Sequence, residues 1–433
     1  MAWTRSHLKL VAGVLSGAFV VCALTGLVLT YRPEIQEIDR PQPSAFASDV
    51  VARGEILVGL GDCSVCHTKH GGASYAGGKA LATPFGVLFS TNITPDEKTG
   101  IGRWSLDAFR RAMRDGVARD GSFLYPAFPY EHYTHLTDPD IEAIYAFLMT
   151  RRAVDSPAQQ NRLIPPLGFR PLLAGWNLLF LHKGIWQPDP KLNDDLNRGS
   201  YLVEALAHCG ACHTPRNIAG GEQRGRAFAG GVAEGWNAPA LDRSNPAARP
   251  WTADEIFTYL RTGIDMNHSV AAGPMGPVTT NLAAAPADDV RAIAAYVASL
   301  MARPGQEATA STAPVDRPDE AAKAHPAGAV LFAGACAGCH GPGAPMMGQG
   351  RPKLSLASPV READPRNVIQ IVVQGVRPDQ GVAGPVMPSL GTAFTDTQVA
   401  DLVAYVRARY SDLPAWPKLE AAVAKARKEG AIP

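Results

Sequence analysis

Apolar side chains recur along this chain at helical spacing, and the same arrangement occurs three times. In the segments DIEAIYAFL, DVRAIAAYVASL and QVADLVAYVRARY, apolar residues stand three positions apart. This spacing predicts amphipathic helices, each with an apolar stripe that packs against a neighbouring helix. The aligned stripes are Ile141, Ile144 and Phe147; Val290, Ile293 and Tyr296; and Val399, Leu402 and Tyr405. We expect the stripes to lie in the cores of three repeated units, called units 1, 2 and 3 below.

Each unit also contains two shorter predicted helices. One is apolar, is entered through glycine, and opens the unit in RGEILVGLGDC, RGSYLVEALAHC and PAGAVLFAGAC. The other ends at Gly116, Gly263 or Gly375, where we expect a left-handed C-cap because glycine adopts that conformation without strain. Two predicted helix starts carry capping boxes, Thr252 with Glu255 and Thr395 with Gln398.

The N-terminal region has a different pattern. Residues Leu10 to Tyr31 form an uncharged run of 22 residues, which is long enough to cross roughly 30 Å of hydrocarbon. Arg5 and Lys9 precede the run, so the N-terminus is expected inside and the rest of the chain outside. A cleaved signal peptide is the alternative, but its apolar core is usually shorter, and the A-x-A sequence at 45–47 lies far beyond the run. We therefore expect an uncleaved transmembrane anchor.

Composition narrows the function classes. The 433 residues carry a formal net charge of +1, which argues against nucleic acid as a partner because that function usually needs a basic surface. Charged residues make up only 19 % of the chain, while 42 glycines and 36 prolines are present. These values indicate compact, loop-rich units rather than long helical bundles.

Six of the seven cysteines lie in three copies of the pattern C-x-x-C-H. The copies are Cys63, Cys66 and His67; Cys209, Cys212 and His213; and Cys336, Cys339 and His340. This pattern is the attachment sequence of c-type haem, in which two thiols on one face of a helical turn bond the porphyrin and the histidine binds the iron. A zinc site would need two C-x-x-C pairs close together, and a thioredoxin-like site explains neither the histidine nor the repetition. We therefore expect three covalently bound haem c groups.

Two methionines are the candidate sixth ligands of the iron. Met275 lies twelve residues after Gly263, and Met387 lies twelve residues after Gly375. Flanking proline and glycine predict irregular loops at both positions, and thioether sulfur is a good ligand for haem iron opposite histidine. Met346 and Met347 are rival ligands in unit 3, but they stand at a different offset.

Unit 1 departs from this pattern, because the residue twelve positions after Gly116 is Phe128. Three arrangements remain open for the iron of haem 1. A histidine binds it, for which His132 is the favoured candidate and His135 or His70 are lesser ones. Alternatively, another group reaches the iron, or the iron stays five-coordinate beneath the phenyl ring. Ligation by two histidines would lower the haem 1 potential relative to the methionine-bound haems.

These features predict a mainly α protein with three tandem class I cytochrome c domains after an N-terminal transmembrane helix. The expected segments are 1–47 (anchor and linker), 48–152 (domain 1), 153–192 (apolar interdomain linker), 193–302 (domain 2), 303–324 (linker), 325–411 (domain 3) and 412–433 (tail). Two uses of the apolar linker remain open, namely packing against domain 1 and contact with a bilayer or a partner subunit. The tail is expected to be a solvated helix.

Over nearly its whole length, the chain resembles the three-haem cytochrome c subunits of membrane-bound bacterial periplasmic dehydrogenases. The stretches STNITPD, GIGRWS, LYPAFPY, FRPLLAGWNLLF and NRGSYLVEALAHCGACHTPRN are most similar to the branch that partners molybdenum hydroxylases, such as aldehyde, nicotinate or isoquinoline oxidoreductases. The alcohol and gluconate branches typically read YPAMPY, from which Phe128 departs. The resemblance implies a molybdopterin subunit, a [2Fe–2S] subunit, ubiquinone as electron acceptor, and haem domains on the periplasmic side of the bacterial inner membrane.

We therefore expect an electron-transfer subunit of a quinone-linked aldehyde or N-heterocycle dehydrogenase rather than an enzyme on its own. The sequence contains no dinucleotide fingerprint, P-loop or substrate-site constellation, and in such a protein the haems carry the chemistry. One alternative is the cytochrome subunit of a PQQ alcohol or FAD gluconate or sugar dehydrogenase. The others are a cytochrome with a catalytic five-coordinate haem 1 and a free-standing electron shuttle.

Overall fold

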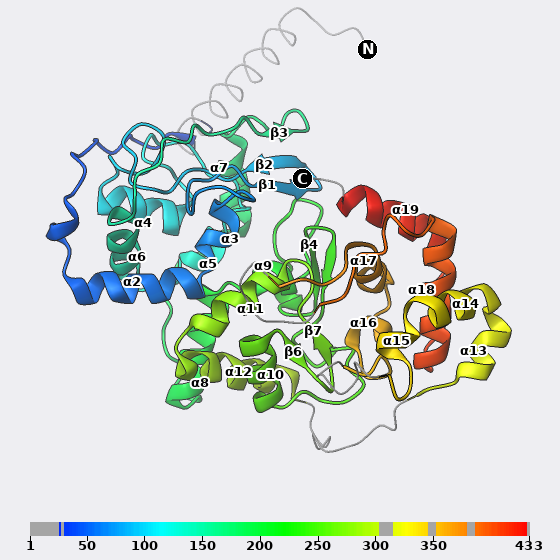
Figure 1. The fold of residues 1–433 in the computed structure, drawn as a ribbon. Coiled ribbons are helices and arrows are strands. Elements are labelled where there is room, and N and C mark those ends of the chain that lie inside the picture. The colour runs from blue at the N-terminus through cyan, green and yellow to red at the C-terminus, as the bar shows by residue number, and fades with distance from the viewer. Residues whose placement is uncertain (1–25, 27–29, 303–314, 345–351, 379–385, 431–433) are drawn as a thin grey trace, which may run out of the picture.

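The computed structural model describes residues 26, 30–302, 315–344, 352–378 and 386–430. Its helices form three groups that follow the order of the chain, from blue and cyan through green to yellow and red (Figure 1). Unit 2 lies between units 1 and 3, and its short strands face both neighbours (Figure 1). The described part is mainly helical, as the sequence predicts.

In each unit, one helix leads into the cysteine motif, and a later helix packs against that first helix. Unit 1 contains η1 (Pro43–Ala45), α2 (Ser48–Leu60), α3 (Cys63–His67), β1 (Ala80–Thr83), β2 (Gly86–Phe89), α4 (Leu106–Asp115), α5 (Tyr130–Tyr133) and α6 (Asp138–Met149). The connection to unit 2 contains β3 (Arg162–Leu163) and α7 (Leu172–Phe180).

Units 2 and 3 repeat the order of helices with different strands and additions. Unit 2 contains α8 (Asp194–Tyr201), η2 (Leu202–Leu206), α9 (Gly210–His213), η3 (Arg224–Arg226), β4 (Gly231–Ala233), β5 (Trp236–Ala238), α10 (Ala253–Thr262), β6 (Ile264–Asp265), β7 (Ser269–Val270), α11 (Met275–Ala284) and α12 (Ala287–Met301). Unit 3 contains α13 (Pro318–Ala324), α14 (Pro326–Ala335), α15 (Ala337–His340), α16 (Ser358–Arg361), α17 (Arg366–Gln374), α18 (Asp396–Tyr410) and α19 (Leu419–Gly430).

The strands form three small antiparallel sheets at the edges of the helical groups. In the first, β2 pairs with β1 in the register Ala80 to Phe89, and β3 pairs with the other edge of β2. The other two are the hairpins β4–β5 and β6–β7. The strand β3 therefore ties the connection between units 1 and 2 to unit 1.

The first and last helices of each unit cross at a glycine. In unit 1, a Cβ atom at Gly54 would lie 2.0 Å from the carbonyl oxygen of Ala143 and 2.7 Å from Cβ of Phe147. Only a residue without a side chain fits at this distance, so the two backbones approach directly. The same contact is made by Gly199 with Ala292 and Tyr296, and by Gly328 with Asp401 and Tyr405.

The predicted apolar stripes are confirmed as core. Ile141, Ile144 and Phe147 are almost completely buried, as are their counterparts in α12 and α18. The buried apolar residues form two clusters. One cluster is shared by units 1 and 2, and the other belongs to unit 3 alone. The packing therefore joins units 1 and 2 more closely than the sequence repeat alone suggests.

The predicted helix ends are confirmed except at one position. Both capping boxes form, at the N-termini of α10 and α18. Gly116 and Gly263 adopt the left-handed conformation. Gly375 differs, with φ 77° and ψ −171°, because the chain after it turns directly into an extended segment in which Val376 pairs with Met387.

Units 2 and 3 meet through polar contacts. Asn367 on α17 pairs reciprocally with the backbone of Asn237 on β5, with both hydrogen bonds 2.9 Å long. The side-chain amides of Asn237 and Asn367 also donate to the carboxyl group of Glu362, over 3.3 and 3.0 Å. Burial raises the pKa of Glu362 to about 8, although these two hydrogen bonds oppose the shift. This boundary therefore contains a buried acid.

The expected solvated tail is wrong, because α19 packs on α17 and α18. Val423 and Ala426 are 0 % and 2 % exposed, and Trp416 before the helix is also buried. Arg427 forms an ion pair with Asp396 at the N-terminus of α18, over 2.6 Å. The helix α19 is therefore held in place mainly by the apolar side chains of the segment AAVAKA, although the rest of the helix is charged.

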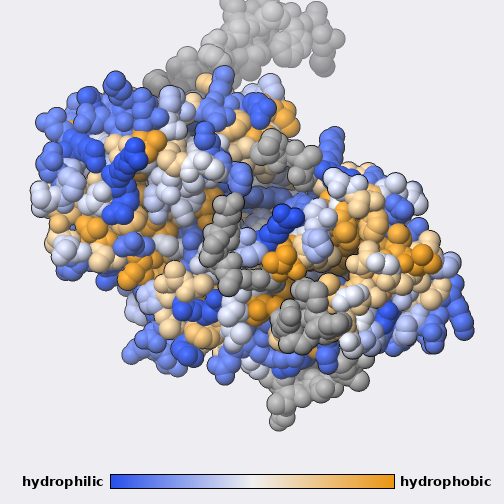
Figure 2. Space-filling model, in the orientation of Figure 1, coloured by the Kyte–Doolittle hydropathy of each residue, from blue (hydrophilic) through white to orange (hydrophobic). Residues whose placement is uncertain are grey.

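The apolar connection 153–192 packs against the units with some of its side chains and exposes others to solvent. Trp176 packs edge-on against Tyr130 of unit 1, and its indole donates to the carbonyl oxygen of Ala219 in unit 2 over 2.9 Å. Leu178 and Leu179 on the same helix are 71 % and 67 % exposed. The expectation of internal packing is thus confirmed for one face of α7 only. Elsewhere, apolar residues also reach the visible surface over the helices of unit 3 (Figure 2).

Within the described ranges, no helix has the length and apolar character needed to cross a membrane. The predicted anchor, 10–31, lies almost entirely outside these ranges.

The helix crossing predicts opposite effects for two glycines of α14. Gly328→Ala should destabilise unit 3 by about 1–3 kcal/mol, because the new methyl group overlaps the backbone of α18. Gly334→Ala should stabilise it by up to about 1 kcal/mol, because open space surrounds this position and alanine favours helix. Hydrogen exchange of peptides from α14 and α18, measured by mass spectrometry, resolves the two effects. Equal protection in both variants would contradict the crossing.

The raised pKa of Glu362 predicts that the free energy of unfolding decreases as the pH rises. Its pKa is higher in the folded protein than in the unfolded chain, so the folded state holds the proton more tightly. Its contribution is fully present below about pH 4.5 and is lost as the pH rises through about 8. Glu362→Gln should remove this part of the decline, a difference on the order of a few kcal/mol between the two ends of that range. Chemical denaturation at both pH values tests it, and a variant whose stability declines as steeply as the wild type's would refute it.

Candidate haem sites

The three cysteine motifs each form a short helical turn. Residues Cys63–His67 make up α3, while Cys209 and Cys336 directly precede α9 and α15. This geometry brings the two thiols of each motif to one face of the turn, and all six are free of disulfides. Burial raises the pKa of Cys63 and of Cys209 to about 12.

Two of the motif histidines are oriented for iron binding. The Nδ1–H group of His67 donates to the carbonyl oxygen of Thr91 over 2.7 Å, and that of His213 donates to Pro239 over 2.6 Å. A carbonyl can only accept, so these bonds place the proton on Nδ1 and leave Nε2 with a lone pair for a metal. Burial lowers the pKa of both histidines, which favours the neutral, ligating form. The donor sets in units 1 and 2 therefore fit haem c.

The candidate sixth ligands occupy related but not identical local structures. Met275 is the first residue of α11 and is partly buried against the core of units 1 and 2. The predicted irregular loop is therefore wrong at this position, since the helix begins immediately after Pro274. Met387 lies in an extended segment, where its backbone pairs with Val376, and its side chain contacts the core of unit 3. Met346 and Met347 fall outside the described residues.

Phe128 occupies the equivalent position of unit 1, two residues before α5. Its ring lies between those of Tyr133, with centroids 5.4 Å apart, and Tyr130, at 6.3 Å. It is partly buried and packs against the core shared by units 1 and 2. The phenyl ring therefore fills the place that a thioether takes in the other units.

His132, the favoured histidine for haem 1, lies between units 1 and 2. Its Nδ1 is 2.7 Å from the carbonyl oxygen of Glu204, and its Nε2 is 2.9 Å from the carboxylate of Glu222. Its ring also lies against Gly210 in the second cysteine motif. Burial lowers the pKa of His132, but Glu222 outweighs this effect and the net shift is upward. In this arrangement, iron binding by His132 would require one of its hydrogen bonds to break.

The lesser histidine candidates are placed elsewhere. His135 is bonded through Nδ1 to the carbonyl oxygen of Gly184, over 2.5 Å, and this contact holds the connection 153–192 against unit 1. His70 is exposed on the surface after the first motif.

A π-helical turn explains why Glu204 can accept from His132. In the helix that opens unit 2, Cys209 lies ten residues after Gly199, whereas Cys63 lies nine residues after Gly54. The π-helical turn η2 accommodates the extra residue, because its backbone hydrogen bonds join residues five positions apart along the chain. In one of them, the N–H group of Ala207 donates to the carbonyl oxygen of Leu202 over 2.7 Å. The widened geometry of η2 leaves the Glu204 carbonyl oxygen available to the imidazole.

Units 1 and 2 face each other in a nearly symmetric way. The helix after the candidate ligand of each unit packs on the opening helix of the other, α5 on η2 and α11 on α2. Asp62, the residue before Cys63, accepts from Asn281 across the joint over 2.6 Å. His208, the residue before Cys209, lies with its ring 5.5 Å from that of Tyr133. The residues that directly precede the first two cysteine motifs thus both make contacts across the joint.

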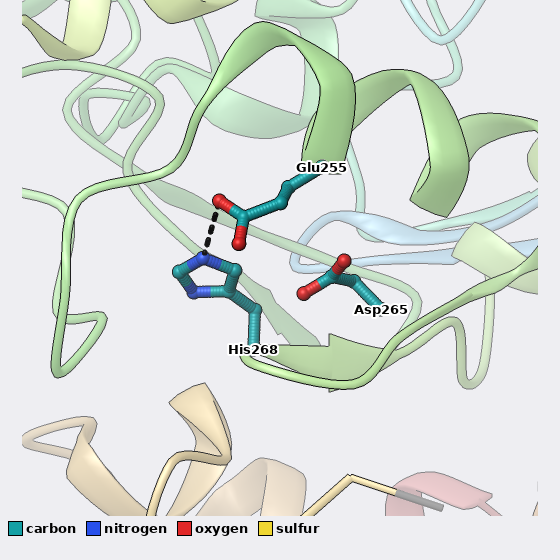
Figure 3. Close-up of side chains that lie close together, drawn as sticks. All are labelled: Glu255, Asp265 and His268. Carbon is teal, nitrogen blue, oxygen red and sulfur yellow. Dashed lines mark hydrogen bonds and ion pairs between the residues drawn. The ribbon is translucent and has the colours of Figure 1, made fainter. Parts of the chain in front are cut away.

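Three further side chains gather in unit 2 where the sequence gives no motif. Ligand atoms of Glu255, Asp265 and His268 lie within 4.8 Å of one another, and Figure 3 shows the His268 ring facing the Glu255 carboxylate. His268 is completely buried and stacks on Trp251, with centroids 3.7 Å apart.

The Glu255 carboxylate is already engaged, which indicates a structural role for this cluster. It forms an ion pair with Arg249 over 2.8 Å and completes the capping box of α10. The carbonyl oxygen of His268 accepts from Ser358 N–H of unit 3 over 2.9 Å. The capping box is the one part of this cluster that the sequence reveals, because the other contacts join distant segments.

Comparisons with known proteins agree with the haem motifs. Residues 323–406 match the family model of cbb3-type cytochrome c oxidase subunit III. The chain is 44 % identical over 420 residues to one of the subunits of nicotinate dehydrogenase from Pseudomonas putida, an alignment that covers 96 % of this chain and 35 % of that protein. It therefore spans about a third of the length of that relative.

Two relatives are matched over most of their own length. The cytochrome c subunit of gluconate 2-dehydrogenase from Pantoea cypripedii is 37 % identical, with 84 % of this chain and 86 % of that subunit aligned. The cytochrome subunit of fructose dehydrogenase from Gluconobacter japonicus is 33 % identical, with 87 % and 82 % aligned. With its C-x-x-C-H turns and oriented histidines, the chain belongs to the family of cytochrome c subunits of dehydrogenase complexes.

Proposed function

We propose that this chain carries three haem c groups in three tandem cytochrome c domains and passes electrons from a catalytic dehydrogenase subunit to ubiquinone. The observation that carries this proposal is the pair of contacts across the joint made by Asp62 and His208, which directly precede the first two cysteine motifs, together with the hydrogen bonds that fix Nδ1 of His67 and His213. Haem supplies one-electron oxidation and reduction when bound. The protein supplies covalent attachment, axial ligands and a fixed spacing between sites.

Each residue of the three sites has a role in this proposal. The six cysteines hold the porphyrins, and His67, His213 and His340 bind the irons on one side. Met275 and Met387 bind the irons of haems 2 and 3 on the other side, where a thioether raises the potential. Support comes from their equal offset from Gly263 and Gly375 and from their half-buried positions beside the two cores.

The proposed partner is a dehydrogenase with molybdopterin and [2Fe–2S] subunits that oxidises an aldehyde or an N-heterocycle. The identity of 44 % to the nicotinate dehydrogenase relative supports this choice over a PQQ or FAD partner. The gluconate and fructose relatives support the alternative, at lower identity. The uncharged run 10–31 supports a membrane anchor with the haem domains on the periplasmic side of the inner membrane.

Removing a proposed thioether should open one iron and leave the others unchanged. Met275→Ala and Met387→Ala should each lower the potential of one haem and create a high-spin signal in its electron paramagnetic resonance spectrum. Met266→Ala is the matched control, because Met266 lies nearby in unit 2 and its side chain is exposed. Redox titration of the purified protein measures the effect. Spectra and potentials identical to the wild type's would reject the assignment for that methionine.

The partner is tested by assembly and electron flow. Co-expression with a molybdopterin subunit and a [2Fe–2S] subunit should give a complex in which an aldehyde or N-heterocycle reduces the haems, seen by visible absorption. Added ubiquinone should then reoxidise them. A chain with Cys63, Cys66, Cys209 and Cys212 changed to alanine should assemble poorly or carry no current. Reduction only by a PQQ or FAD enzyme would overturn the choice of partner while leaving the cytochrome role intact.

A further inference from the structure

We propose that the iron of haem 1 has no protein ligand on the Phe128 side and that this position binds small neutral π-acceptor diatomics such as carbon monoxide or nitric oxide. The inference rests on the proposed function to the extent that Cys63, Cys66 and His67 hold a haem. It follows from the tyrosines, histidines and glutamate of the loop 125–136, which are already paired with other parts of the chain.

The tyrosines of this loop are committed to other partners. The hydroxyl of Tyr130 donates to the side-chain oxygen of Asn177 over 2.7 Å, and Tyr130 itself is completely buried against Gly116. The hydroxyl of Tyr133 donates to the carbonyl oxygen of Gly61 over 3.4 Å, and that of Tyr125 donates to the connection at Leu167 over 3.2 Å.

The histidines and the acid of the loop are committed as well. Both nitrogens of His132 are bonded within unit 2, to Glu204 and Glu222. Glu131 lies 3.7 Å from Arg216 of unit 2, and His135 is bonded to Gly184. Because the contacts of His132 and Glu131 hold unit 1 against unit 2, breaking one to bind iron would weaken the joint between them.

Two buried methionines of unit 1 are also explained by packing. Met113 on α4 and Met149 on α6 are 5 % and 0 % exposed within the shared core. The matching residues of unit 2 are Leu260 and Ala298, counted from the paired glycines and aromatic residues. Because unit 2 has apolar residues without a ligand atom at these two positions, we attribute the methionines of unit 1 to core packing. Neither methionine is therefore left as a donor for the Phe128 face.

The character of this face selects the class of ligand. Phe128 is partly buried beside two tyrosine rings, so the surroundings of this position are apolar. None of the hydroxyl or imidazole groups of the loop is left to donate a hydrogen bond there. Carbon monoxide and nitric oxide bind ferrous iron without such a donor, whereas bound dioxygen depends on distal hydrogen bonds for its stability. No bond of the protein breaks and no electron is transferred when these ligands bind.

The test is carbon monoxide binding by the dithionite-reduced, full-length protein with its haems in place. We expect one carbon monoxide per chain, or one per three haems, because Met275 and Met387 close the other irons. Phe128→Met should abolish this binding and raise the potential of one haem, since it places a thioether at the equivalent position. Phe89→Met, a half-buried phenylalanine elsewhere in unit 1, should leave carbon monoxide binding unchanged.

His132 is tested by the same measurement. His132→Gln and His132→Ala should bind one carbon monoxide, as the wild type does. A wild type that binds none, combined with a His132→Ala protein that binds one, would overturn the proposal and make His132 the ligand. If His132→Ala fails to fold, the wild-type titration and its low-spin or high-spin resonance signal decide alone. A chain that carries haem but binds no carbon monoxide rejects this inference only, whereas a chain without haem rejects the proposed function.

Discussion

Each unit of this protein depends on one close helix crossing, in which the backbone of the opening helix touches that of the closing helix at a glycine. At Gly54, Gly199 and Gly328 even a methyl group would overlap a carbonyl oxygen of the partner helix. The crossing fixes where the opening helix points when it reaches the first cysteine, eight to ten residues later. The distance between crossing and motif differs in all three units, and the π-helical turn η2 adjusts the longest one. The extra residue between crossing and cysteine motif in unit 2 therefore changes the helix locally to a π-helical turn, while the crossing at the glycine is kept.

The sequence predicts those features that depend on neighbours along the chain. Helix stripes, both capping boxes and the cysteine turns are all local patterns, and the structure confirms them. The sequence does not predict contacts between distant segments, because no periodic pattern records them. The two hydrogen bonds of His132, with partners 72 and 90 residues away, are of this kind. So is the burial of α19, for which the charges of the segment AAVAKARKEG gave a misleading signal.

The two joints between units are built from different interactions. Units 1 and 2 share one apolar core, and their motifs face each other across it. Unit 3 has its own core and meets unit 2 through asparagine pairs and the buried acid Glu362. Burial raises the pKa of Asp62 at the first joint to about 6 and that of Glu362 at the second to about 8. The two joints therefore depend on pH over different ranges.

The unusual position of Phe128 follows from the same joint. In a symmetric pair, both loops would offer a sulfur to their own iron, yet only unit 2 has Met275 at this place. The loop of unit 1 instead uses His132 to bond the freed carbonyl oxygen of Glu204 and uses Glu131 to approach Arg216. A side chain that bridges two units cannot also bind iron without weakening that bridge. Unit 1 therefore places its polar side chains in the joint and leaves an apolar ring at the position that Met275 takes in unit 2.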